Sequence, residues 1–77
     1  MENQELTYGQ KAVGLTFNPS GSEHVDAIKK GYALIIDLMD EVRKSATSPE
    51  IARLASVAIT AAQTAKMWAD KAVTWKE

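Results

Sequence analysis

Two long runs of apolar residues, spaced alternately by three and four positions, constrain this fold more than any other feature. One run covers residues 25–42 and the other covers residues 51–75. Such spacing places the apolar side chains on one stripe of an amphipathic α-helix. The sequence therefore predicts two long helices, whose stripes are Val25, Ile28, Tyr32, Ile35, Met39 and Val42, and Ile51, Leu54, Ala58, Ala61, Ala65, Trp68, Ala72 and Trp75.

The limits of the first helix are indicated by its flanking residues. Ser20 and Glu23 have the spacing of a capping box, in which a serine hydroxyl accepts a backbone N–H bond and a glutamate reaches back. A helix over residues 21–46 is expected. Residues 1–20 have no sustained period and are expected to form a short N-terminal arm or helix.

A short turn separates the two predicted helices. Pro49 suits the first position of a helix, and Ser48 is its predicted N-cap, so the second helix is expected over residues 49–76. Two long amphipathic helices joined by so short a connection form an antiparallel hairpin. The second helix is apolar beyond one stripe, which indicates a further contact face.

The small size of the chain predicts assembly. A single domain of 77 residues buries little surface, and without cysteine it has neither disulfides nor thiolate metal ligands. We therefore expect an all-α domain over residues 1–77 that assembles into a homo-oligomer. The sequence contains no signal-peptide pattern and no apolar stretch approaching the roughly 18 residues of a membrane span, so an intracellular protein with no membrane association is expected.

Composition also narrows the function classes. Nine basic residues against ten acidic ones leave a formal charge of −1, which argues against a DNA-binding protein. The only histidine, His24, has no cysteine or second histidine with which to build a typical zinc site. Asp37, Asp40 and Glu41 fit a solvated helix face better than an acid–base pair. No enzyme, cofactor or metal is therefore expected.

The turn before the first helix is a candidate anion site. Its residues lead into a helix N-terminus, whose free N–H groups and dipole attract anions, and aromatic rings beside cations suit unpaired bases. An ordinary turn and cap, with an aromatic residue that only packs, remains the alternative. The candidate residues are Tyr8, Phe17, Asn18, Pro19, Ser20, Lys29 and Lys30.

The sequence LTFNPSG leading into VDAIK, followed by AITAAQTAKMWADKAV in the second helix, resembles the helical hairpin of the phage anti-CBASS and anti-Thoeris sponge proteins. The resemblance covers about residues 15–75 and is closer to the anti-CBASS branch. It implies homohexamers in the host bacterial cytoplasm. These proteins bind cyclic oligonucleotides or cyclic ADP-ribose signals, without cleaving them, and so block antiviral signalling.

The resemblance also implies roles for particular residues. Phe17, followed by Asn18, matches an aromatic residue that stacks on cyclic dinucleotides, although the family usually has tyrosine there. Lys29 matches a lysine that contacts the same ligands. In the family's separate trinucleotide pocket, Thr60 and Gln63 match, whereas Ile59 occupies the position of an arginine, and Arg53 and Lys66 are the cations available to replace it.

Two readings therefore follow from the sequence. The leading one is a sponge for cyclic dinucleotides, with cyclic trinucleotides and cyclic ADP-ribose isomers as further candidate ligands. The alternative is a non-catalytic helical hairpin that serves only as an interaction or structural protein. Binding of a cyclic nucleotide distinguishes the two.

Overall fold

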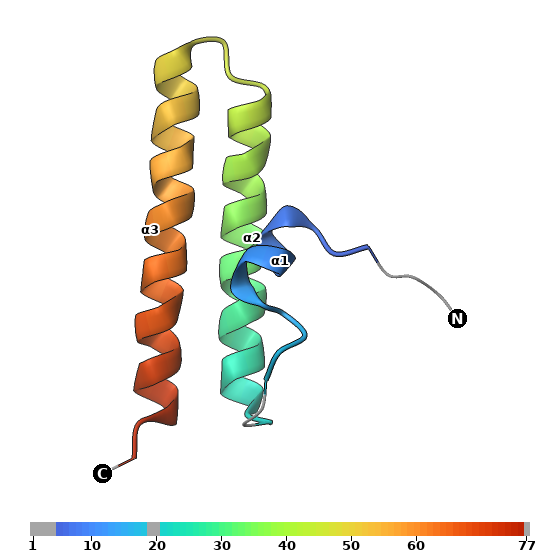
Figure 1. Ribbon diagram of the computed structural model, residues 1–77, viewed down its shortest axis with the longest axis vertical. Helices are drawn as coiled ribbons and strands as arrows, with labels where there is room; N and C mark the ends of the chain where they lie inside the picture. The colour runs from blue at the N-terminus through green and yellow to red at the C-terminus, as the bar shows by residue number, and fades with distance from the viewer. Residues whose placement is uncertain (1–4, 19–20, 77) are drawn as a thin grey trace.

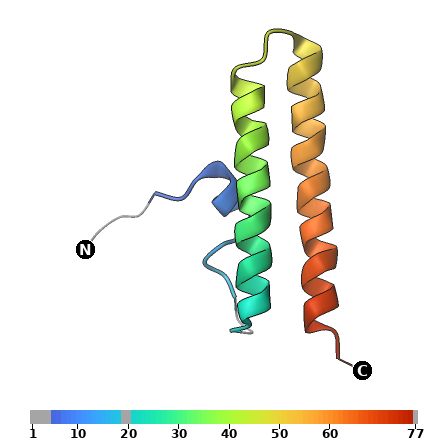
Figure 2. The same cartoon turned by 180° about the vertical axis from the view of Figure 1, so that it is seen from behind.

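Two long helices lie side by side and antiparallel, and a short helix packs across one of them (Figures 1 and 2). The computed structural model describes residues 5–18 and 21–76, which contain the helices α1 (Tyr8–Val13), α2 (Glu23–Lys44) and α3 (Pro49–Thr74) and no strand. The turn between α2 and α3 closes one end of the hairpin, and the other end is open. None of the described helices combines the length and apolar character needed to cross a membrane.

Capping residues explain where the long helices begin. Ser22 is the N-cap of α2, and its hydroxyl accepts a hydrogen bond from Val25 N at 3.3 Å. The prediction that Ser20 is the N-cap is therefore wrong, and Ser20 itself lies outside the described residues. Ser48 caps α3 as predicted, accepting from Ile51 N at 3.2 Å. Both long helices are shorter than the expected ranges of 21–46 and 49–76.

The short helix α1 is built from local signals in residues 7–14. Thr7 and Gln10 form a reciprocal capping box, and Gly14 ends the helix in the left-handed conformation, at φ 65°. Gly9 contacts the backbone of α2 so closely that a β-carbon there would lie 2.2 Å from Ala33 O. Its backbone N–H also donates to Asp37 Oδ1 at 2.7 Å. These contacts dock the N-terminal segment on α2.

The core lies where the three helices meet, and it includes side chains from all of them: Val13, Ala33, Ile36, Ile59 and Ala62. The predicted stripes are offset from it. Ile35 and Val42 are exposed on α2, because the buried side of this helix must cover both α1 and α3. On α3 the centre of the buried side runs through Ala55, Ile59 and Ala62 instead.

Large apolar side chains cover the outer surfaces of both long helices. On α2 the exposed set is Leu34, Ile35, Leu38 and Val42. On α3 it includes Leu54, Val57, Met67 and Trp68, and the exposed Trp75 directly follows that helix. The predicted stripe of α3 is thus largely solvent-facing in the single chain. Apolar surface of this extent is typical of a protein–protein contact.

Candidate functional site

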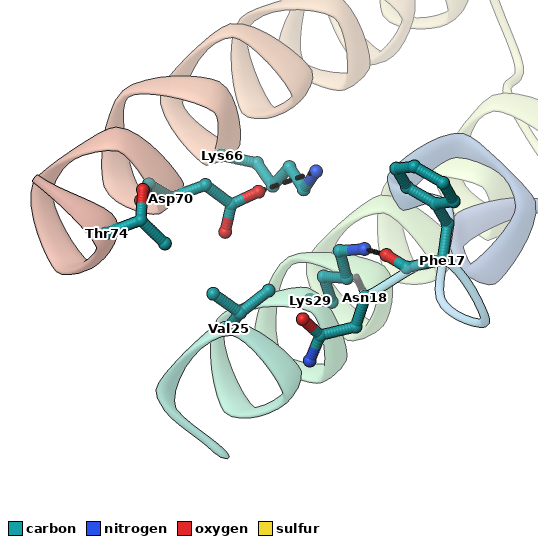
Figure 3. A pocket seen from close by; sticks show the side chains of 7 residues that line it. All are labelled: Phe17, Asn18, Val25, Lys29, Lys66, Asp70 and Thr74. Atoms are coloured by element: carbon teal, nitrogen blue, oxygen red, sulfur yellow. Dashed lines mark hydrogen bonds and ion pairs between the residues drawn. The ribbon is translucent and has the colours of Figure 1, made fainter. Parts of the chain in front are cut away.

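A pocket of about 220 Å³ lies between the start of α2 and the end of α3. These two segments form the open end of the hairpin (Figure 1). One wall comes from the segment before α2 and from the first turns of α2, and the opposite wall comes from the last turns of α3 (Figure 3). The antiparallel arrangement brings these distant segments together. The lining residues are Phe17, Asn18, Val25, Lys29, Lys66, Asp70 and Thr74.

Lys29 joins the first wall of the pocket to the N-terminal segment. Although it is a lysine, only 4% of its surface is exposed. Its ammonium group donates hydrogen bonds to the backbone carbonyls of Gly14, at 2.9 Å, and of Phe17. It also lies 5.6 Å from the centre of the Phe17 ring, within the range of a cation–π interaction. Lys29 therefore determines where Phe17 lies.

Phe17 presents an aromatic face at the edge of the pocket. The residue is 70% exposed, while its backbone N–H donates to Gly14 O at 2.9 Å and its carbonyl accepts from Lys29. An exposed aromatic ring on an anchored backbone loses little entropy when a planar group stacks on it. The arrangement is thus suited to binding a base.

Asn18 links the segment before α2 to the start of that helix. Its side-chain amide donates to Ser22 O at 3.0 Å and to Asp26 Oδ1 at 2.9 Å. Its side-chain oxygen accepts from Gly21 N at 3.1 Å. These bonds attach Asn18 to residues 21, 22 and 26, so Asn18 helps to position the neighbouring Phe17.

The opposite wall of the pocket contains an ion pair. Lys66 and Asp70 are separated by one turn of α3, and their side chains meet at 2.7 Å with 17% and 22% of each exposed. Thr74 follows one turn later on the same face. Among the pocket residues, two lysines and one aspartate carry charge, which leaves one net positive charge per chain.

The volume of the pocket limits how much of a ligand one chain can hold. Sites for drug-sized ligands usually have volumes of about 300–1,000 Å³, whereas this pocket measures about 220 Å³. One chain therefore provides room for part of such a ligand, such as a single base.

The remaining predicted residues lie elsewhere. Tyr8 lines a different hollow, on the α1 side of α2, and its ring lies 5.2 Å from the Arg43 guanidinium. Arg53 is exposed near the closed end and pairs with Glu50 at 2.6 Å. Three others do not line the pocket, namely Lys30 and Thr60, which are exposed, and Gln63, which is half-buried. Pro19 and Ser20 lie outside the described residues.

Sequence reasoning assigned no role to Asp70 or Thr74. A signal was present, because residues 66, 70 and 74 recur every four positions and so share one face of a helix. That face becomes part of a pocket only once the last turns of the second helix are placed beside the start of the first. Predicting this part of the pocket requires the relative alignment of the two helices, which the sequence pattern does not give.

Comparison with known proteins identifies the hairpin. The family model described as the Acb2/Tad1 hairpin domain matches residues 10–74, which is most of the chain and includes every residue of the pocket. Neither the curated proteins nor the solved structures contain a significant match. The chain therefore belongs to the Acb2/Tad1 hairpin family, whose members are anti-defence sponges that bind cyclic nucleotides.

Proposed function

We propose that this protein is a phage immune-evasion protein that sequesters cyclic dinucleotides without cleaving them, in the cytoplasm of the host, and so blocks CBASS-type signalling. The observation that supports this proposal most strongly is the exposed ring of Phe17 beside two lysines in one pocket. Unpaired bases stack on aromatic rings, and lysine ammonium groups neutralise phosphates. Family membership supports the same class of ligand.

The proposed site is completed by a second chain. A cyclic dinucleotide is close to two-fold symmetric, and an isologous interface presents each residue twice. Two pockets then offer two aromatic faces and two net positive charges to a ligand with two bases and two phosphates. The exposed apolar residues of α2 and α3 provide surface for such assembly, and we propose a homohexamer.

Cyclic trinucleotides and cyclic ADP-ribose isomers are secondary candidate ligands. Of the residues assigned to the trinucleotide site, Arg53, Thr60 and Gln63 do not share the pocket described above, whereas Lys66 lines it. A trinucleotide site built on Arg53, Thr60 and Gln63 therefore lies outside this pocket. Arg53 needs to exchange its partner Glu50 for a phosphate, a change that its exposed position permits.

Isothermal titration of the purified protein tests the proposal directly. The ligands are cyclic GMP-AMP, a cyclic trinucleotide and a cyclic ADP-ribose isomer, and the bound ligand is recovered after heat denaturation. We expect binding of the dinucleotide and release of the unaltered molecule. Absence of heat with all three ligands supports the interaction-protein alternative, and recovery of a modified product indicates an enzyme.

Variants of two residues test the assignment of the pocket. Phe17→Leu keeps an apolar side chain but removes the stacking face, whereas Phe17→Tyr keeps that face and adds a hydroxyl. Loss of one stacking partner costs about 1–3 kcal/mol per base, so Phe17→Leu should weaken dinucleotide binding at least fivefold while Phe17→Tyr retains it. Lys29→Ala should also weaken binding, and Lys11→Ala is the control because Lys11 is exposed and outside the pocket. Unchanged affinity in both Phe17→Leu and Lys29→Ala contradicts the assignment.

A further inference from the structure

Asp70 has a carboxylate oxygen that no described residue satisfies. Its Oδ2 accepts from Lys66 Nζ at 2.7 Å, whereas Oδ1 is buried and has no hydrogen-bond partner within residues 5–18 and 21–76. Leaving a buried acceptor unpaired costs free energy, and charged acceptors cost more than neutral ones. Because Asp70 lines the pocket, a ligand that supplies a donor removes this cost.

The position of Asp70 suits contact with a ligand. Its carboxylate extends from α3 toward the pocket wall formed by α2, as Figure 3 shows. Rotation about the Cβ–Cγ bond of aspartate meets only a low barrier, because this torsion has broad minima. Oδ1 can therefore turn toward a ligand in the pocket, and an ionised carboxylate only accepts hydrogen bonds.

We propose that Asp70 selects the base of the ligand and favours guanine. This inference rests on the proposed function. Guanine presents two adjacent donors, N1–H and the N2 amino group, to which an ionised carboxylate is complementary. Adenine presents its N1 lone pair beside the N6 amino group. One carboxylate oxygen would then oppose adenine N1, which is also an acceptor, and no hydrogen bond would form between them. The pocket therefore binds guanine-containing cyclic dinucleotides more tightly than adenine-containing ones.

The unsubstituted protein gives the first test, which depends on no variant. Its affinity is measured by isothermal titration for cyclic di-GMP, cyclic di-IMP and cyclic di-AMP, whose bases offer two donors, one donor, and one donor beside an acceptor. We expect affinity to fall in that order, by about tenfold for each base between the first and the last. Equal affinities, or tighter binding of cyclic di-AMP, overturn base selection by Asp70 while leaving the sponge proposal intact. Absence of binding by all three overturns the dinucleotide proposal together with this inference.

Asp70→Asn gives the second test. The amide replaces one acceptor by a donor, which complements the edge of adenine, so the ratio of cyclic di-GMP to cyclic di-AMP affinity should fall at least tenfold. Glu41→Gln is the matched control, because it changes the net charge equally at an exposed side chain outside this pocket, and its ratio should equal that of the parent. A ratio in Asp70→Asn that matches the parent's contradicts the proposal, provided that circular dichroism shows the variant to be helical.

Discussion

Replacing Gly9 by alanine should detach α1 from the hairpin. The new β-carbon would lie 2.2 Å from Ala33 O and 2.9 Å from Asp37 Oδ1, closer than real β-carbons approach such atoms. Ala33 O belongs to the backbone of α2 and has little room to move. The steric conflict is therefore relieved by displacement of α1, which carries residues 14–18 with it.

The magnitude follows from the contacts that α1 makes. Undocking breaks the bond from Gly9 N to Asp37, worth about 1.5–3 kcal/mol for a charged acceptor. It also exposes Val13, which is 2% exposed in the fold, at a cost of about 1.5–2 kcal/mol. We expect Gly9→Ala to reduce the free energy of unfolding by roughly 3–5 kcal/mol. A domain of this size has little more to lose.

Urea denaturation at fixed protein concentration measures this loss, and hydrogen exchange of the α1 amides locates it. Gly31→Ala is the control, since among the described residues no atom beyond its chain neighbours and the adjacent backbone of its own helix lies within 4 Å of the new β-carbon. Replacing glycine by alanine in the interior of a helix should raise the free energy of unfolding by about 0.5–1 kcal/mol. The reasoning is refuted if Gly9→Ala changes stability by less than about 1 kcal/mol and leaves the α1 amides protected.

Two further predictions concern acid stability and assembly. The pKa of Asp40 is held below its usual 3.8, because its carboxylate accepts hydrogen bonds from Arg43 and Lys44. The unfolded chain then binds more protons in acid, so stability should be lost as pH falls below about 4, and Asp40→Asn should flatten that loss in denaturation curves measured from about pH 6 to pH 2. Leu38→Glu should dissociate the proposed assembly in analytical ultracentrifugation, because this residue is 48% exposed in the single chain and lies on the apolar surface that we propose as the interface; an unchanged sedimentation coefficient places the interface elsewhere.

The hairpin itself could be predicted from the sequence, because the apolar period and Ser48-Pro49 depend only on local chemistry. The sequence could not predict which side of each helix faces the core. The second helix is apolar on more than one side, so Ile59 and Ala58 are equally plausible core residues until the partner helix is placed. Choosing between them requires knowledge of the packing of three helices, which periodicity does not contain.

In the candidate site, too, local features could be predicted from the sequence and features that depend on packing could not. Phe17, Asn18 and Lys29 are close in sequence, so a local motif was enough to group them. Burial of Lys29 was not predictable, because lysines are usually exposed and this one is enclosed by backbone carbonyls of the preceding segment. Asp70 is far from these residues in sequence, and only the antiparallel alignment of α2 and α3 brings it into the same pocket.

The location of the pocket at the open end of the hairpin determines which length changes the fold tolerates. Removing two helical turns from both α2 and α3 beside the connecting turn shortens the molecule but leaves the open end in its present alignment. Deleting one residue from α3 alone, between the turn and Lys66, instead rotates Lys66 and Asp70 by about 100° away from Phe17. A hairpin of this kind can therefore vary in length and keep the pocket, provided that both helices change together.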